Sequence, residues 1–146
     1  MSEHVAQTLK NHVRFHPPFH YILTPILLLH FAWRVRALIN DPGVGTAESV
    51  MLAFGLVVMG VLSRTNALKA QDRLIRLEEQ LRYSRVLPAT LAAKASALPV
   101  PQIVALRFAP DEELAVLVDQ VISGQLVKPA DIKKAIKNWR GDYYRV

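Results

Sequence analysis

Residues 47–85 contain no proline, yet their character changes partway along. The first part, Ser49 to Leu62, is apolar on every face, whereas Ser63 to Arg85 carries charge on most faces. A helix crosses a membrane with about 20 predominantly apolar residues, and no helix breaker separates the two parts here. This stretch therefore predicts one uninterrupted helix that begins inside a membrane and ends in water.

A narrow apolar stripe with a seven-residue repeat follows the charged part of this helix. With Ala67 as heptad position a, small or apolar residues occupy the a and d positions of a short coiled-coil seam. Traced backwards, the stripe enters the apolar part through small residues, which let helices in lipid approach closely. The predicted seam consists of Ala53, Leu56, Gly60, Ser63, Ala67, Ala70, Leu74, Leu77 and Leu81. Its partner is either the chain's own other crossing or a second copy, and such a stripe also arises by chance on surface helices.

A second apolar stretch, Phe19 to Trp33, precedes the long helix and predicts another membrane crossing. Pro25 lies inside it and cannot donate a hydrogen bond to the carbonyl of Tyr21. We therefore expect a kink, with the Thr24 hydroxyl available to the backbone. Asn40 to Thr46 is rich in turn-forming residues, so the two crossings should be antiparallel neighbours.

Basic residues near the ends of the crossings predict how the hairpin is oriented. Lys10, Arg14, Arg64, Lys69, Arg73 and Arg76 lie on the side of the termini, and Arg34 and Arg36 on the side of the turn. Since basic residues concentrate on the cytoplasmic side, both termini are expected in the cytoplasm, with the chain in a bacterial inner membrane. The expected fold is all-α, with an N-terminal interfacial segment (1–18), a transmembrane hairpin (19–62), a helical stalk (63–87) and a helical module (88–146).

Proline and glycine divide the C-terminal module into short amphipathic helices. The acids Asp111, Glu112 and Glu113 open one helix, and Gly124 is its expected stop. The last helix should carry an apolar stripe made of Ile132, Ala135, Ile136 and Trp139. A module of this size is near the lower limit for independent stability, so it should pack on the long helix or on a neighbouring subunit.

Residues that could carry chemistry are sparse. The chain has no cysteine, which excludes disulfides, thiolate nucleophiles and cysteine-ligated metals. Four of the five histidines, His12, His16, His20 and His30, lie close to or within the first crossing, and the second crossing has none, so one chain cannot form a bis-histidine haem site in the membrane. Hydrogen bonding at the headgroup level is favoured for them over a haem shared between two copies. We predict no catalytic residue, metal or cofactor.

The formal charge of +6 favours an anionic partner, and the apolar stretches point to lipid headgroups before nucleic acid. Arg34 and Arg36 lie just across the turn from Glu48, which could clamp the hairpin by ion pairing. His30 lies deeper in the crossing. If the chain forms a pore, His30 and Arg34 are the ionisable pair expected along the pathway.

Three stretches carry a family resemblance: Asn11 to Phe15 with Pro17 and His20, Gln102 to Leu114, and Lys133 to Arg145. Together they resemble an uncharacterised family of small bacterial membrane proteins, known as a domain of unknown function. The resemblance covers nearly the whole chain and implies two crossings with a cytoplasmic C-terminal module. It implies no activity, ligand or catalytic residue. Within it, Asn11 to Phe15 and Leu106 to Phe108 are where we expect the family's function or assembly contact.

Three hypotheses for function follow from these patterns. The leading hypothesis is a non-enzymatic inner-membrane protein that self-associates along the seam, as a scaffold or as an accessory subunit of a larger membrane complex. The alternative is a small homo-oligomeric channel or transporter. The third is a membrane-tethered nucleic-acid binder that uses the basic tail from Lys133 to Arg145.

Overall fold

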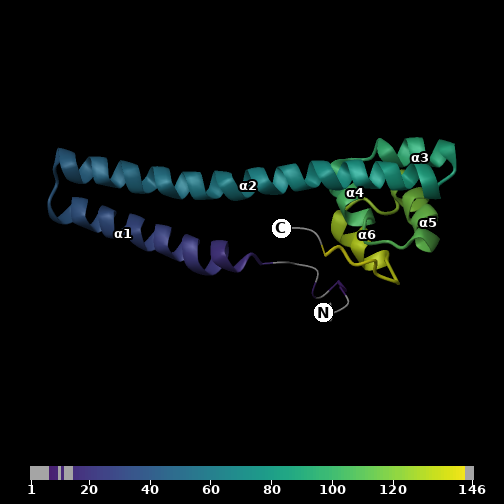
Figure 1. Cartoon of the computed structure of the whole chain (residues 1–146), viewed down its shortest axis with the longest axis horizontal. Coiled ribbons are helices and arrows are strands. Elements are labelled where there is room, and N and C mark those ends of the chain that lie inside the picture. Colours follow the sequence, from purple (N-terminus) through teal and green to yellow (C-terminus); the bar gives the residue numbers. More distant parts are fainter. Residues whose placement is uncertain (1–6, 10, 12–14, 144–146) are drawn as a thin grey trace. The chain divides into compact units, whose positions relative to one another are not determined.

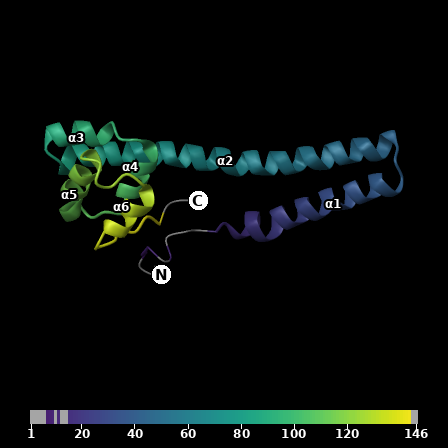
Figure 2. The same cartoon turned by 180° about the vertical axis from the view of Figure 1, so that it is seen from behind.

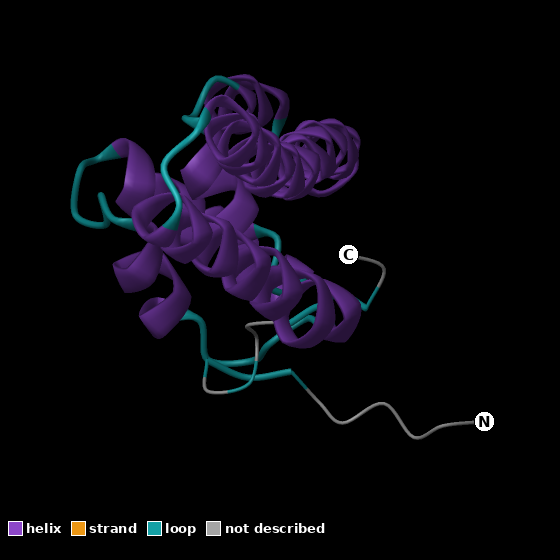
Figure 3. Ribbon diagram, turned by 90° about the vertical axis from the view of Figure 1, so that its left-hand side faces the viewer, coloured by secondary structure: helices purple, strands orange, loops and turns teal. Residues whose placement is uncertain are grey.

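The structure is a computed structural model that describes residues 7–9, 11 and 15–143. These residues form helices and no strand (Figure 3), which confirms the all-α prediction. The chain divides into two compact units, Arg14–Leu68 and Lys69–Val146 together with Met1–Val13. Most of the N-terminal interfacial segment, the centre of the motif at residues 11–15, and the last residues of the basic tail lie outside the described residues.

The first unit is built from two apolar helices that run in opposite directions (Figure 1). They are α1 (Thr24–Asn40), preceded by a π-helical turn η1 (Pro18–Leu23), and the first part of α2 (Val44–Val86). The connection is short, and the Thr46 hydroxyl holds it by accepting a hydrogen bond of 3.0 Å from the amide of Gly43. Helix α2 starts at Val44, slightly before the start predicted at Ala47.

The kink expected at Pro25 stays a prediction, but a π-helical turn lies on the N-terminal side of this proline. The Thr24 amide bonds the carbonyl of Phe19, five residues earlier, and the Thr24 hydroxyl donates to the same oxygen at 2.8 Å. Proline supplies no amide hydrogen for the next helical bond, so the preceding turn can widen at little cost. The Thr24 hydroxyl thus satisfies the backbone as the sequence predicts.

Two helical segments are long and apolar enough to cross a membrane. The most apolar windows of Pro18–Asn40 and Val44–Val86 have mean hydropathies of 1.5 and 1.8. Only 0% and 6% of these two windows, in the same order, are buried. A helix from the core of a soluble protein is covered by its neighbours. These windows lack such cover within the described chain, which agrees with the two crossings predicted from the sequence.

In the second unit, the last part of α2 and four short helices surround one hydrophobic core (Figure 2). They are α3 (Ala89–Ser96), α4 (Val100–Leu106), α5 (Asp111–Ile122) and α6 (Pro129–Ala135). Gly124 ends α5 with a φ of +78°, a conformation that favours glycine, as predicted. The largest fully buried side chains are Tyr83, Phe108, Ile103, Leu106, Leu114, Ile132 and Val118.

The last helix is shorter than its predicted apolar stripe. It ends at Ala135, and Ile136 is extended with a ψ of 122°. The amides of Lys137 and Asn138 donate to the carboxylate of Glu113 at 2.9 and 3.0 Å, and so make no helical bonds. Trp139 therefore lies beyond the helix, where its ring stacks at 4.8 Å from that of Phe108.

Candidate functional site

The membrane half of the seam, defined as Ala53, Leu56 and Gly60, lies on the α1 side of α2. Ala53 is 1% exposed, Gly60 is buried and Leu56 is half-buried. A Cβ added to Gly60 would lie 3.0 Å from Cδ1 of Leu27 in α1. The small residues of this half therefore let the two helices of one hairpin approach each other. Ser63, the first seam residue after the apolar part of α2, is exposed.

The stalk half of the seam, defined as Ala67, Ala70, Leu74, Leu77 and Leu81, is exposed throughout. Its three leucines, which we call the leucine stripe, are 56%, 55% and 52% exposed in chain order. Burying a leucine side chain contributes about 1.5–3 kcal/mol, so leaving three of them in water on one face is unfavourable. The second unit leaves this face uncovered.

The face of α2 almost opposite the leucine stripe packs against the helical module. Ile75, Glu79, Tyr83 and Leu87, spaced four apart, are all buried. Residues four apart lie above one another on a helix, so they form a second stripe with one acidic member. This second stripe was not predicted from the sequence, although its i, i+4, i+8 spacing was a usable signal.

Buried Glu79 is the centre of an ion cluster. Its carboxylate oxygens accept hydrogen bonds from Arg82 at 3.1 Å and from Arg140 at 3.2 Å. Arg82 also reaches the start of α5, donating to the carboxylate of Asp111 at 2.8 Å and, just before this helix, to the carbonyl of Ala109 at 2.8 Å. The cluster thus ties α2 to two segments that are distant in the sequence.

A second ion pair holds the segment after α6. The Arg107 Nε atom lies 3.0 Å from a carboxylate oxygen of Asp142, and the Arg107 guanidinium stacks 4.3 Å from the ring of Phe108. The side-chain amide of Gln7 both donates to and accepts from the Asp142 backbone at 2.9 Å. Residues before the first crossing and near the C-terminus therefore belong to one unit.

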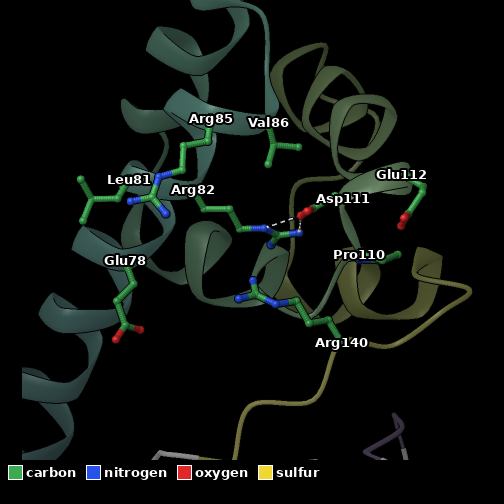
Figure 4. A pocket seen from close by; sticks show the side chains of 9 residues that line it. All are labelled: Glu78, Leu81, Arg82, Arg85, Val86, Pro110, Asp111, Glu112 and Arg140. Carbon is green, nitrogen blue, oxygen red and sulfur yellow. Dashed lines mark hydrogen bonds and ion pairs between the residues drawn. The ribbon is translucent and has the colours of Figure 1, made fainter.

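An open groove of about 610 Å³ lies beside the cluster (Figure 4). Figure 4 shows Arg82 pointing toward Asp111 across the groove. Three acids and three arginines line the groove, so its lining charges largely compensate one another. The lining residues are Glu78, Leu81, Arg82, Arg85, Val86, Pro110, Asp111, Glu112 and Arg140.

Burial and hydrogen bonding shift two acid–base groups of the second unit. Burial, followed by the nearby charge of Glu79, raises the pKa of the Tyr83 phenol above its usual range, and Arg82 opposes this. Hydrogen bonds from Lys137 and Asn138 lower the pKa of the Glu113 carboxyl. Asp111 and Glu113, predicted as acids of a first helical turn, also bond specific partners in the structure.

The predicted hairpin clamp residues lie in the first unit. His30 and Arg34 are half-buried, whereas Arg36 and Glu48 are exposed. No ion pair among the described residues joins Glu48 to Arg34 or Arg36. Within the described ranges, no group of three or more acidic or histidine side chains is placed to hold a metal ion.

These features define a class of all-helical proteins with two potential membrane-crossing helices and a helical module that leaves one leucine stripe exposed. The chain belongs to a family of unknown function (DUF6526), whose family model matches residues 1–146. This confirms the family membership that the sequence resemblance implied. Comparison with curated proteins gives no significant match, and comparison with solved structures gives none either.

Proposed function

We propose that this chain is a non-enzymatic inner-membrane protein that self-associates, as a scaffold or as an accessory subunit of a membrane complex. The observation that carries the proposal is the exposed leucine stripe on α2, the helix whose earlier part is apolar enough to cross a membrane. Stripes of this kind are normally buried by another helix. We propose that the membrane half of the seam packs against α1 of the same chain and not against a second copy, because Gly60 lies close to Leu27.

The proposed orientation has both termini in the cytoplasm. Arg64, Lys69, Arg73 and Arg76 follow the second crossing, whereas Arg34 and Arg36 are near the turn. The hydrogen bonds between Gln7 and Asp142 support an arrangement with both ends of the chain on one side.

Mass measurement of the full chain in nanodiscs tests self-association. We expect a dimer or larger assembly for the wild type and a monomer for Leu77→Glu, because the new carboxylate would lie in the contact. Val116→Glu is the matched control, since Val116 of α5 is 62% exposed and outside the seam. A strictly monomeric wild type would refute the proposal.

Thiol labelling tests the orientation, because the chain contains no cysteine of its own. Gly45→Cys places a thiol in open space near the turn, and Gln125→Cys places one in an exposed loop of the module. In intact cells, an impermeant maleimide should label the first variant and reach the second only after the inner membrane is permeabilised. The reverse pattern would contradict a cytoplasmic module.

A further inference from the structure

The two faces of α2 in the second unit have different roles. Ile75 and Tyr83 are buried against the chain's own module, while the leucine stripe is more than half exposed on the other face. The chain itself therefore buries one face of this helix. The apolar side chains of the other face can be buried only by a surface outside this unit.

The residues that flank the leucine stripe identify that occupant. With Leu74 and Leu81 at heptad position a and Leu77 at d, Arg73 occupies position g and Glu78 the following position e. In a parallel two-stranded coiled coil, a g residue meets the e residue of the next heptad on the partner helix. Arg73 and Glu78 have opposite charges, and both are exposed. The stripe is thus complementary to a second copy of itself in parallel register.

The apolar positions before the leucine stripe agree with a close helix pair. Ala67 and Ala70 occupy the preceding a and d positions and are exposed. Short side chains there would let two helices approach closely. Ser84 occupies the last d position, and its hydroxyl donates a hydrogen bond of 2.8 Å to the carbonyl of Leu81. This bond limits the free-energy cost of burying the hydroxyl in a helix contact.

We infer that the stalk halves of two copies form a parallel, in-register coiled coil, with Leu74, Leu77 and Leu81 in its core and Arg73 paired with Glu78 of the other copy. This inference rests on the proposed function, because two chains anchored in one membrane with the same orientation present parallel stalks. It places the contact between copies on the stalk and leaves the membrane half of the seam to each hairpin.

Single cysteines in the full chain test the register. In a parallel, in-register pair, each core residue faces its own counterpart, so Leu74→Cys and Leu77→Cys should each form a disulfide-linked dimer under mild oxidation in nanodiscs. Arg76→Cys is the matched control, because Arg76 is exposed on the same helix but lies off the stripe. If neither core variant cross-links while the wild type has the mass of an oligomer, self-association stands and the stalk contact is wrong.

A charge exchange tests the ion pair. Arg73→Glu places like charges opposite each other at two symmetry-related sites, and so does Glu78→Arg. Each should raise the dissociation constant of the dimer by roughly 5- to 30-fold at low salt. The double variant Arg73→Glu/Glu78→Arg should recover most of this loss, because the pairs form again with reversed sign. Single variants with wild-type affinity, or a double variant no better than the singles, would overturn the parallel pairing.

Discussion

Arg140, near the end of the described chain, donates a hydrogen bond of 3.2 Å to Glu79, 61 residues earlier in α2. Glu79 is 4% exposed, and its other carboxylate oxygen accepts from Arg82. A buried carboxylate is tolerated only when its charge is paired and its oxygens are hydrogen-bonded. This relationship therefore fixes the last segment of the chain onto the long helix.

Replacing Glu79 should destabilise the helical module. Glu79→Gln keeps the shape but leaves Arg82, with only 10% of its side chain exposed, without one of its two acidic partners. We expect a loss of about 2–4 kcal/mol in the free energy of unfolding, measured by denaturant titration of the full chain in detergent. Glu112→Gln is the control, because Glu112 is exposed and should tolerate the change. Equal stability of the two variants would show that the cluster contributes little.

The glycine at the helix contact of the hairpin should resist enlargement. Gly60→Leu would push against Leu27, whose Cδ1 lies 3.0 Å from the added Cβ, so we expect about 1–3 kcal/mol of destabilisation from overpacking. Gly55→Leu introduces the same side chain in the same helix where nothing lies within 4 Å. Steric-trap unfolding in bicelles compares the two. If Gly55→Leu costs as much as Gly60→Leu, the close approach is not the reason for glycine at position 60.

Removing the Glu113 carboxylate should make the stability of the module less sensitive to acidic pH. Its pKa is lowered in the folded state, so the resulting stability is present above the unfolded pKa of about 4.3 and disappears as pH falls through the folded value. Glu113→Gln should therefore lower the melting temperature by a few degrees at pH 7, and the difference from wild type should shrink in acid. Glu112→Gln, which removes an exposed charge from the same helical turn, is the control. Thermal scans between pH 7 and pH 3 make the comparison.

Removing the Tyr83 hydroxyl should stabilise the module. The hydroxyl is buried and has no hydrogen-bond partner among the described residues, so Tyr83→Phe should raise the free energy of unfolding by about 1 kcal/mol at neutral pH. Because the pKa of Tyr83 is raised in the folded state, this residue makes the free energy of unfolding of the wild type decline only above the unfolded pKa of about 10. In Tyr83→Phe, the free energy of unfolding should no longer show this decline at alkaline pH.

The exposed phenol of Tyr21 provides the control for that prediction. Tyr21→Phe should leave the unfolding of the second unit unchanged at both neutral and alkaline pH. A Tyr83→Phe variant that is less stable than the wild type would mean that the hydroxyl is satisfied in solution, for example by an ordered water.

Much of the secondary structure could be predicted because its signals are local. Proline and glycine set the start of α4 and the end of α5, and the proline-free stretch between Pro42 and Pro88 contains the whole of α2. The end of α6 could not be predicted in this way. It depends on the Glu113 carboxylate, which takes the amides of Lys137 and Asn138 from across the module.

Of the candidate site, the sequence predicted the stripe but not how its two halves differ. Ala53 and Leu77 fall on the same seven-residue repeat, yet Ala53 is 1% exposed and Leu77 is 55% exposed. A repeat shows which residues share a face of a helix and does not show which neighbour covers that face. The ion cluster around Glu79 was missed for a related reason, since Arg140 and Asp111 are distant in the sequence.

The sequence by itself determined that this chain is helical, where α2 and α5 begin and end to within a few residues, and that two helical stretches are apolar enough to cross a membrane. These properties depend on side-chain periodicity, hydropathy and backbone breakers, which act over one or two helical turns. Only the tertiary structure decided that Gly60 contacts Leu27, that buried Glu79 is paired, and that the leucine stripe is left exposed. Those outcomes depend on which surfaces meet, and packing between residues distant in the sequence sets that.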